Sequence, residues 1–151
     1  MATPARSIAV LLVDDDPGDV LMIEEALESI DAPRAVYVVN DGEEAVAFLR
    51  HTGEFTQAPR PDVILLDLNM PRMDGRQVLA EIKADDHLRT IPIVVLTTSQ
   101  APADIMSSYA LHANAYVTKP LNLDDLTEVV HKIDYFFARI AALPGVRAAE
   151  I

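Results

Sequence analysis

Short runs of apolar residues recur along the chain, and most of them end at polar residues. The runs Ile8–Val13, Val63–Leu66 and 91–96 carry no polar side chain at alternate positions. Continuous apolar runs of this length are typical of parallel strands that are buried on both faces. We therefore predict strands at these three places, and two shorter strands at 35–39 and 115–117.

Between these runs the apolar residues lie three or four positions apart, which predicts helices. The first helix is predicted to begin at Pro17, because proline is favoured at the first helical position and the Asp16 side chain before it can cap the helix. Further helices are predicted at 43–50, at 76–84, from Pro102 onward and at 123–142. A strand followed by a helix, five times over, predicts an α/β fold with a parallel sheet.

The last two helices carry apolar residues whose surroundings matter for function. In the helix from Pro102, we expect Ile105, Met106 and Tyr109 to face the core. The helix at 123–142 would be about 30 Å long, more than the neighbouring strands need. We therefore expect its end to project beyond the sheet, and we hypothesise a homodimer through this helix, with helix four and strand five as further candidates. The candidate dimer face is Tyr135, Phe136, Phe137 and Ile140.

Composition narrows the class of protein. The chain has 151 residues, half of them apolar, which fits one domain at 8–142 between tails at 1–7 and 143–151. A net charge of −12 disfavours direct binding to nucleic acid. The chain has no cysteine, no run of about 18 apolar residues for a membrane span, and no export signal at its N-terminus. These features exclude disulfides and predict a cytoplasmic location with no membrane partner.

Polar residues follow the predicted strands at the edge where parallel strands end, which is where sites form in α/β sheets. Asp14 and Asp15 follow the first strand, Asp67 the third, Thr97 the fourth and Lys119 the fifth. Three crowded carboxylates raise at least one pKa unless a cation intervenes. Mg²⁺ and Lys119 together would balance their charge, and a carboxylate can attack phosphorus to give an aspartyl phosphate. The residues thus indicate a metal-assisted phosphoryl acceptor at Asp67.

These motifs resemble those of the receiver domains of bacterial two-component response regulators, from about residue 8 to residue 140. The resemblance implies a flavodoxin-like, doubly wound (βα)5 fold with strand order 2-1-3-4-5. Too few residues follow the last predicted helix for a DNA-binding or catalytic output module, so we expect output by protein–protein contact, phosphate relay or feedback on the kinase. The matching segments are LVDDDP at 12–17, DVILLDLNMPRMDG at 62–75, IPIVVLT at 91–97 and YVTKP at 116–120.

The resemblance also assigns roles to the acidic residues. Asp67 would accept the phosphoryl group from a sensor histidine kinase. Asp14 and Asp15 would hold Mg²⁺, together with Asp67 and the backbone carbonyl of Asn69. Mn²⁺ and Ca²⁺ are alternative ions for such an oxygen site. The protein would be a signalling protein that takes part in its own phosphorylation and dephosphorylation.

The same resemblance assigns the switch residues. Lys119 would pair with the phosphoryl group, and Thr97 would donate a hydrogen bond to it. Tyr116 would swing inward as the Thr97 hydroxyl moves, and the bond before Pro120 would be a cis-peptide candidate. The end of the chain is similar to stand-alone regulators that pair with phytochrome-type kinases, which indicates a bacteriophytochrome as the candidate partner.

Two other classes stay open from the residues alone. One is an aspartyl-phosphate phosphatase on a related fold, although such enzymes carry a second acid two residues after the nucleophile, where this chain has Asn69. The other is a flavin carrier of similar topology, although the turn after the first strand is acidic where a phosphate would have to bind.

Overall fold

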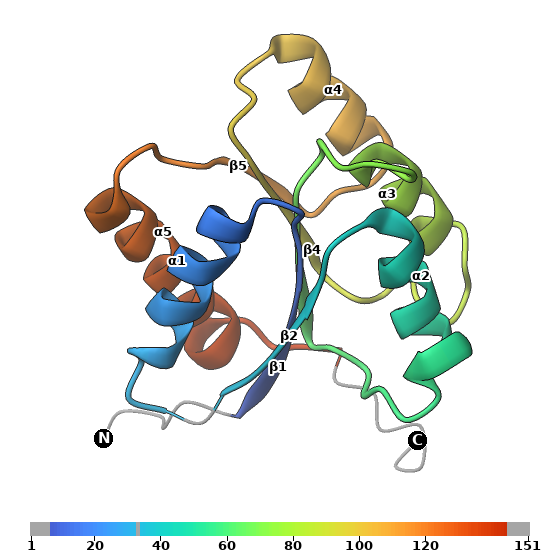
Figure 1. The fold of residues 1–151 in the computed structure, drawn as a ribbon, viewed down its shortest axis with the longest axis horizontal. Helices are drawn as coiled ribbons and strands as arrows, with labels where there is room; N and C mark the ends of the chain where they lie inside the picture. The colour runs from blue at the N-terminus through green and yellow to red at the C-terminus, as the bar shows by residue number, and fades with distance from the viewer. Residues whose placement is uncertain (1–6, 33, 145–151) are drawn as a thin grey trace.

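Five parallel strands form one central sheet in the order β2-β1-β3-β4-β5, as predicted (Figure 1). The structure is a computed structural model that describes residues 7–32 and 34–144, so most of the two predicted tails lies outside the described residues. The strands are β1 (Ile8–Val13), β2 (Arg34–Val39), β3 (Val63–Leu66), β4 (Ile93–Thr97) and β5 (Ala115–Thr118).

Helices cover both faces of the sheet, so its central strands are buried on both sides and need no polar face. Helices α1 and α5 lie together on one face, and α2 and α3 lie on the other (Figure 1). No helix in the described ranges is both long and apolar enough to cross a membrane. The helices are α1 (Pro17–Glu28), α2 (Gly42–Arg50), α3 (Gly75–Lys83), α4 (Pro102–Ala110) and α5 (Leu123–Tyr135), with a short 3₁₀ turn, Gly53–Phe55, in the loop at 51–61.

Capping side chains fix where several helices begin, just beyond the carboxyl edge of the sheet. The Asp16 carboxylate accepts hydrogen bonds from the backbone N–H groups of Gly18 and Asp19 at the start of α1. Asp74 and Gln77 form a reciprocal capping box at the start of α3. Because each cap satisfies N–H groups that have no partner inside the helix, the chain turns sharply after the strand and leaves the strand-end residues together.

Helix α4 differs from the prediction. Met106 is 73 % exposed and Tyr109 is 47 % exposed, so neither faces the core. The buried residue of α4 is Ser108, whose hydroxyl donates to the Asp104 carbonyl at 2.8 Å. Because this hydroxyl is satisfied within the helix, a small polar residue can take the sheet-facing position, with Ile105 half-buried beside it.

The last helix also differs from the prediction. Its α-helical part ends at Tyr135, and a π-helical turn, Phe136–Ile140, follows, closed by a 2.7 Å bond from the Ala141 N–H to the Phe136 carbonyl. The wider turn directs Phe137, which is only 9 % exposed, into the core. Phe137 is therefore wrong as a member of the dimer face, whereas Tyr135, Phe136 and Ile140 are 47 % to 63 % exposed.

Candidate functional site

Three carboxylates converge at the carboxyl edge of the sheet, as the strand ends predicted. Asp14 directly follows β1 and Asp67 directly follows β3, and these two strands are paired neighbours. One carboxylate oxygen from each of Asp14, Asp15 and Asp67 lies within 4.8 Å of the others. Asp14 is buried, Asp67 is 9 % exposed and Asp15 is exposed, so the cluster is open to solvent on one side only.

Lys119 places an ammonium group beside this cluster. It follows β5, is 3 % exposed, and its backbone N–H donates to the Thr97 carbonyl at 2.6 Å. Its Nζ lies 2.9 Å from Asp14 Oδ2 and 2.8 Å from Asp19 Oδ2, both hydrogen bonds. Its Nζ is 3.8 Å from Asp67 Oδ2, an ion pair without a hydrogen bond. Burial lowers the pKa of Lys119, but the hydrogen bonds to Asp19 and Asp14 outweigh it and raise that pKa to about 12.

The charges of the cluster suit a divalent cation. Burial raises the pKa of Asp14 above its ordinary value, and the nearby Asp67 carboxylate adds to this, although the Asp16 N–H and Lys119 donate to Asp14 and oppose it. Three carboxylates against one ammonium leave an excess of negative charge in a partly buried place. Hard oxygen ligands in this arrangement fit Mg²⁺, Mn²⁺ or Ca²⁺. The donor set therefore fits a divalent cation held by Asp14, Asp15 and Asp67.

Asn69 follows Asp67 in the loop after β3. Its backbone N–H donates a long hydrogen bond to Asp67 Oδ1 at 3.4 Å, a local contact between residues two apart. The role of its backbone carbonyl as a metal ligand stays a prediction.

Thr97 lies at the end of β4, next to the cluster in the sheet. It is fully buried, and its hydroxyl has no hydrogen-bond partner among the described residues. A buried hydroxyl without a partner costs about 1–3 kcal/mol. This side chain is thus a donor that an additional group at the site could satisfy.

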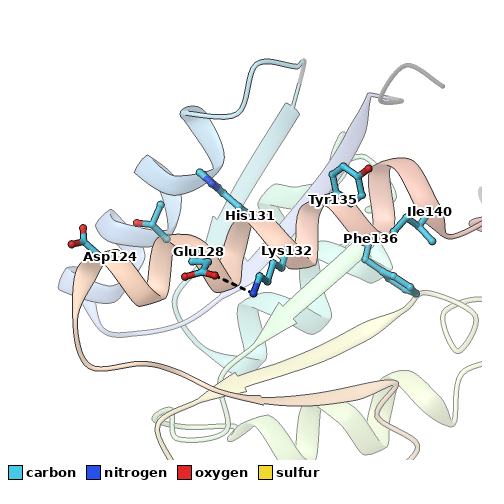
Figure 2. A pocket seen from close by; sticks show the side chains of 8 residues that line it. Asp124, Glu128, His131, Lys132, Tyr135, Phe136 and Ile140 are labelled. Atoms are coloured by element: carbon cyan, nitrogen blue, oxygen red, sulfur yellow. Dashed lines mark ion pairs between the residues drawn. The ribbon is translucent and has the colours of Figure 1, made fainter. Parts of the chain in front are cut away.

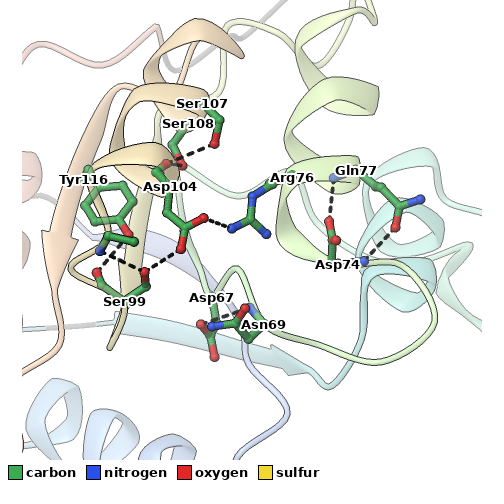
Figure 3. A network of polar contacts seen from close by, with 11 residues as sticks. Asp67, Asn69, Asp74, Arg76, Gln77, Ser99, Asp104, Ser107, Ser108 and Tyr116 are labelled. Atoms are coloured by element: carbon green, nitrogen blue, oxygen red, sulfur yellow. Dashed lines mark hydrogen bonds and ion pairs between the residues drawn. The ribbon is translucent and has the colours of Figure 1, made fainter.

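Tyr116 lies on the neighbouring strand β5 and points toward the loop that follows β4 (Figure 3). Its hydroxyl donates to the Ser99 carbonyl at 2.9 Å, and its ring is partly buried. The predicted inward swing of Tyr116 stays a prediction, because the structure presents one conformation.

A polar network beyond the predicted residues joins this loop to α3 and α4 (Figure 3). The Ser99 hydroxyl donates to Asp104 Oδ2 at 2.5 Å, and the Arg76 guanidinium forms an ion pair with the same carboxylate. The hydrogen bond from Ser99 and the contact with Arg76 lower the pKa of Asp104. Sequence reasoning missed this network, since nothing in the spacing of Arg76 and Asp104, on separate helices, links them.

The expected cis bond before Pro120 is wrong for this structure. All peptide bonds in the described ranges are trans. The trans form is the ordinary preference of a bond before proline, by about 0.5–1 kcal/mol.

Two glycines allow neighbouring helices to pack tightly against the loop that carries Asp67. A Cβ on Gly75 would lie 2.6 Å from Leu68 Cα and would overlap the Asp67 carbonyl oxygen. A Cβ on Gly42 would lie 2.7 Å from Met73 Cβ. Only glycine permits α2 and α3 to approach the Asp67 loop this closely.

The sequence matches the response regulator receiver domain over residues 10–131, and the chain belongs to this family. This membership makes the chain a receiver-domain signalling protein, and it favours the receiver interpretation over the phosphatase and the flavin carrier.

Its relatives include the cyanobacterial response regulators Rcp1 and RcpA. The chain is 45 % identical over 136 residues to the response regulator Rcp1 of Synechocystis, covering 90 % of this chain and 92 % of Rcp1. It is similar to the crystal structure of the phosphorylated cyanobacterial phytochrome response regulator RcpA, with 48 % identity and a TM-score of 0.90 over 93 % of this chain and 100 % of RcpA. The Mn²⁺-bound form of Rcp1 has 44 % identity and a TM-score of 0.87 over 91 % of this chain and 99 % of Rcp1.

Proposed function

We propose that Asp67 accepts a phosphoryl group from a sensor histidine kinase. The observation that carries this proposal is the grouping of Asp67 with Asp14 and Asp15 within 4.8 Å, with the Lys119 ammonium 3.8 Å from Asp67. A carboxylate oxygen of Asp67 attacks the phosphorus atom, and an O–P bond forms. The bond from phosphorus to the kinase's histidine nitrogen breaks, and its electron pair stays on the imidazole. Hydrolysis of the new bond returns Asp67 and inorganic phosphate.

The residues around Asp67 stabilise the charge of the transferred group. Asp14, Asp15, Asp67 and the carbonyl of Asn69 hold the metal, for which Mg²⁺ is the proposed ion and Mn²⁺ or Ca²⁺ the alternatives. Bound there, the cation offsets negative charge on the phosphoryl oxygens. Lys119 Nζ and the Thr97 hydroxyl, which has no partner among the described residues, donate hydrogen bonds to the same oxygens. Tyr116 then follows the Thr97 side chain inward.

The test is covalent modification by a small-molecule phosphodonor such as acetyl phosphate with Mg²⁺. We expect an acid-stable, base-labile adduct on Asp67, detected by mass spectrometry, and none in Asp67→Asn. Asp74→Asn is the matched control, because Asn caps a helix about as well as Asp, and it should keep the adduct. An adduct that persists in Asp67→Asn, or no adduct from either this donor or a cognate kinase, would refute the proposal.

The proposed kinase is of the phytochrome type, and the proposed setting is the cytoplasm. The similarity to RcpA supports the phytochrome-type kinase, because RcpA is a phytochrome response regulator and matches 93 % of this chain. Phosphotransfer from a purified bacteriophytochrome kinase to this chain, compared with kinases of other sensor classes, measures the preference. Equal transfer rates from all of them would contradict it.

The proposed homodimer forms through the end of α5 and the turn that follows it. Tyr135, Phe136 and Ile140 project from these last turns and line an open groove with Glu128 and Lys132 (Figure 2). Exposed apolar side chains gathered in one place mark an interaction surface. Phe136→Ser should shift the protein toward monomer in analytical ultracentrifugation, and Leu21→Ser, at a residue that is 58 % exposed on α1, should not. A wild-type protein that is only monomeric, with and without a phosphoryl mimic, would dispose of this face.

A further inference from the structure

The Lys119 ammonium group contacts three acids, but it donates hydrogen bonds to only two of them. An ammonium group has three N–H donors. One donates to Asp14 Oδ2 at 2.9 Å and one to Asp19 Oδ2 at 2.8 Å, while the distance from Nζ to Asp67 Oδ2 is 3.8 Å. The phosphoacceptor is thus the carboxylate that Lys119 approaches least closely.

Asp19 has no part in the acceptor or metal cluster. It lies in the first turn of α1, and its backbone N–H donates to Asp16 Oδ1 at 3.1 Å. Its side chain is 22 % exposed, so solvent weakens its attraction to Lys119 only in part. The cluster of carboxylates that can share a cation consists of Asp14, Asp15 and Asp67 and leaves Asp19 out. Its contact with the site therefore runs through Lys119.

A phosphoryl group on Asp67 offers the Lys119 ammonium new oxygen acceptors beside the two carboxylates that it already binds. The hydrogen-bond distance from an ammonium nitrogen to an anionic oxygen is about 2.7–2.9 Å, and Asp14 and Asp19 compete with the phosphoryl oxygens for the Lys119 donors at that distance. Asp14 is buried and fixed by a bond from the Asp16 N–H at 2.9 Å, which makes it the rigid partner of Lys119. Asp19 is the more exposed of the two acids that Lys119 binds, so the hydrogen bond to Asp19 is the one that Lys119 can exchange for a bond to a phosphoryl oxygen.

We propose that Asp19 is a positioning residue that holds the Lys119 ammonium away from Asp67 and thereby slows phosphoryl transfer. The inference rests on the proposed function of Asp67 and adds to it a residue that sets the rate. The negative charge of Asp19 acts in the same direction, because it opposes the arrival of further negative charge on the phosphoryl oxygens.

The experiment compares Asp19→Asn with Asp16→Asn. Both variants remove one negative charge from the same turn of α1, and Asn at position 16 keeps the cap. With acetyl phosphate and Mg²⁺, Asp19→Asn should raise the rate of adduct formation at Asp67 by roughly 5-fold, the size expected for the net contribution of one ordinary hydrogen bond. Asp16→Asn should change the rate by less than about 2-fold, because the Asp16 carboxylate is exposed to solvent and forms no ion pair with Lys119.

Two further variants separate positioning from a merely structural role. Asp19→Glu restores the carboxylate and should return the rate toward the wild-type value, whereas Asp19→Ala should be at least as fast as Asp19→Asn. Thermal melts identify any variant that is poorly folded, and the remaining variants then decide. A wild-type protein that forms an adduct while Asp19→Asn is no faster than Asp16→Asn overturns this inference alone. A wild-type protein that forms no adduct overturns the proposed function and this inference with it.

Discussion

The face covered by α1 and α5 and the edge formed by α4 and β5 are built in different ways, although both belong to one sheet. Helices α1 and α5 bury large apolar residues such as Ile23, Leu27, Leu126 and Val130 against the strands. Helix α4 buries only Ser108, and all four residues of β5 are half-buried. Segments with few buried apolar contacts open at lower free energy than the core does. The proposed phosphoacceptor site lies between a firmly packed face and an edge held largely by polar contacts.

Lys119 joins these two regions, so its removal should have the largest effect. Lys119→Met leaves the buried Asp14 carboxylate without its cation, and we expect the free energy of unfolding without metal to fall by about 3–5 kcal/mol at pH 7. Because the pKa of Lys119 is raised to about 12, the stability that it contributes is present below pH 10.5 and is lost as the pH rises through about 12. Urea titrations should therefore show the difference between the two proteins shrinking above pH 10.5. A constant difference up to pH 12 would contradict this account.

The packing contrast itself is tested by one truncation on each side. Leu126→Ala on α5, at a residue that is 1 % exposed, should lower the free energy of unfolding by about 2–5 kcal/mol. Met106→Ala on α4, at a residue that is 73 % exposed, should change it by less than about 0.5 kcal/mol. Equal costs in chemical denaturation would mean that Met106 is covered in solution, as it would be in an interface.

The smallest effect is expected at the polar network of α4. Asp104→Asn weakens the contacts with Ser99 and Arg76, so the amides of α4 should exchange with solvent faster. Asp124→Asn, which removes a charge from the first turn of α5, is the control and should leave α4 unchanged. The pKa of Asp104 is lowered, so the contribution of its carboxylate is present above pH 3.8 and is lost as the pH falls below that value. Hydrogen exchange that is the same in both variants would show that the network does not hold α4.

The sequence predicted the sheet and the acidic site well, because both depend on where apolar runs end. Asp14 and Asp67 stand directly after buried strands, and pairing of β1 with β3 brings them together without further information. The face of α4 was not predictable in this way. Met106 and Tyr109 have the spacing of core residues, although both are exposed. The spacing of apolar residues does not tell whether the sheet or a partner protein covers them.

Two other features depend on geometry that spacing does not record. Phe136 and Phe137 are adjacent, and only the π-helical turn decides that the second one points inward. The hydrogen bond from Lys119 to Asp19 spans 100 residues. Its one available signal was the place of Asp19 in the first turn of a helix that starts at the site, where an acid is also explained by the helix dipole.

The close approach of Gly75 to Asp67 and Leu68 has a consequence for how a signal leaves the site. Gly75, the first residue of α3, packs directly against the backbone of Asp67 and Leu68. Gly42, the first residue of α2, packs equally closely against Met73. Strain that arises when Asp67 gains its new group finds no slack in this direction. On the proposed function, we expect that strain to pass toward Thr97 and the segment after β4, where the Thr97 hydroxyl has no partner among the described residues. The tight packing at Gly42 and Gly75 thus favours a change of structure at the opposite edge of the sheet, at β4 and β5.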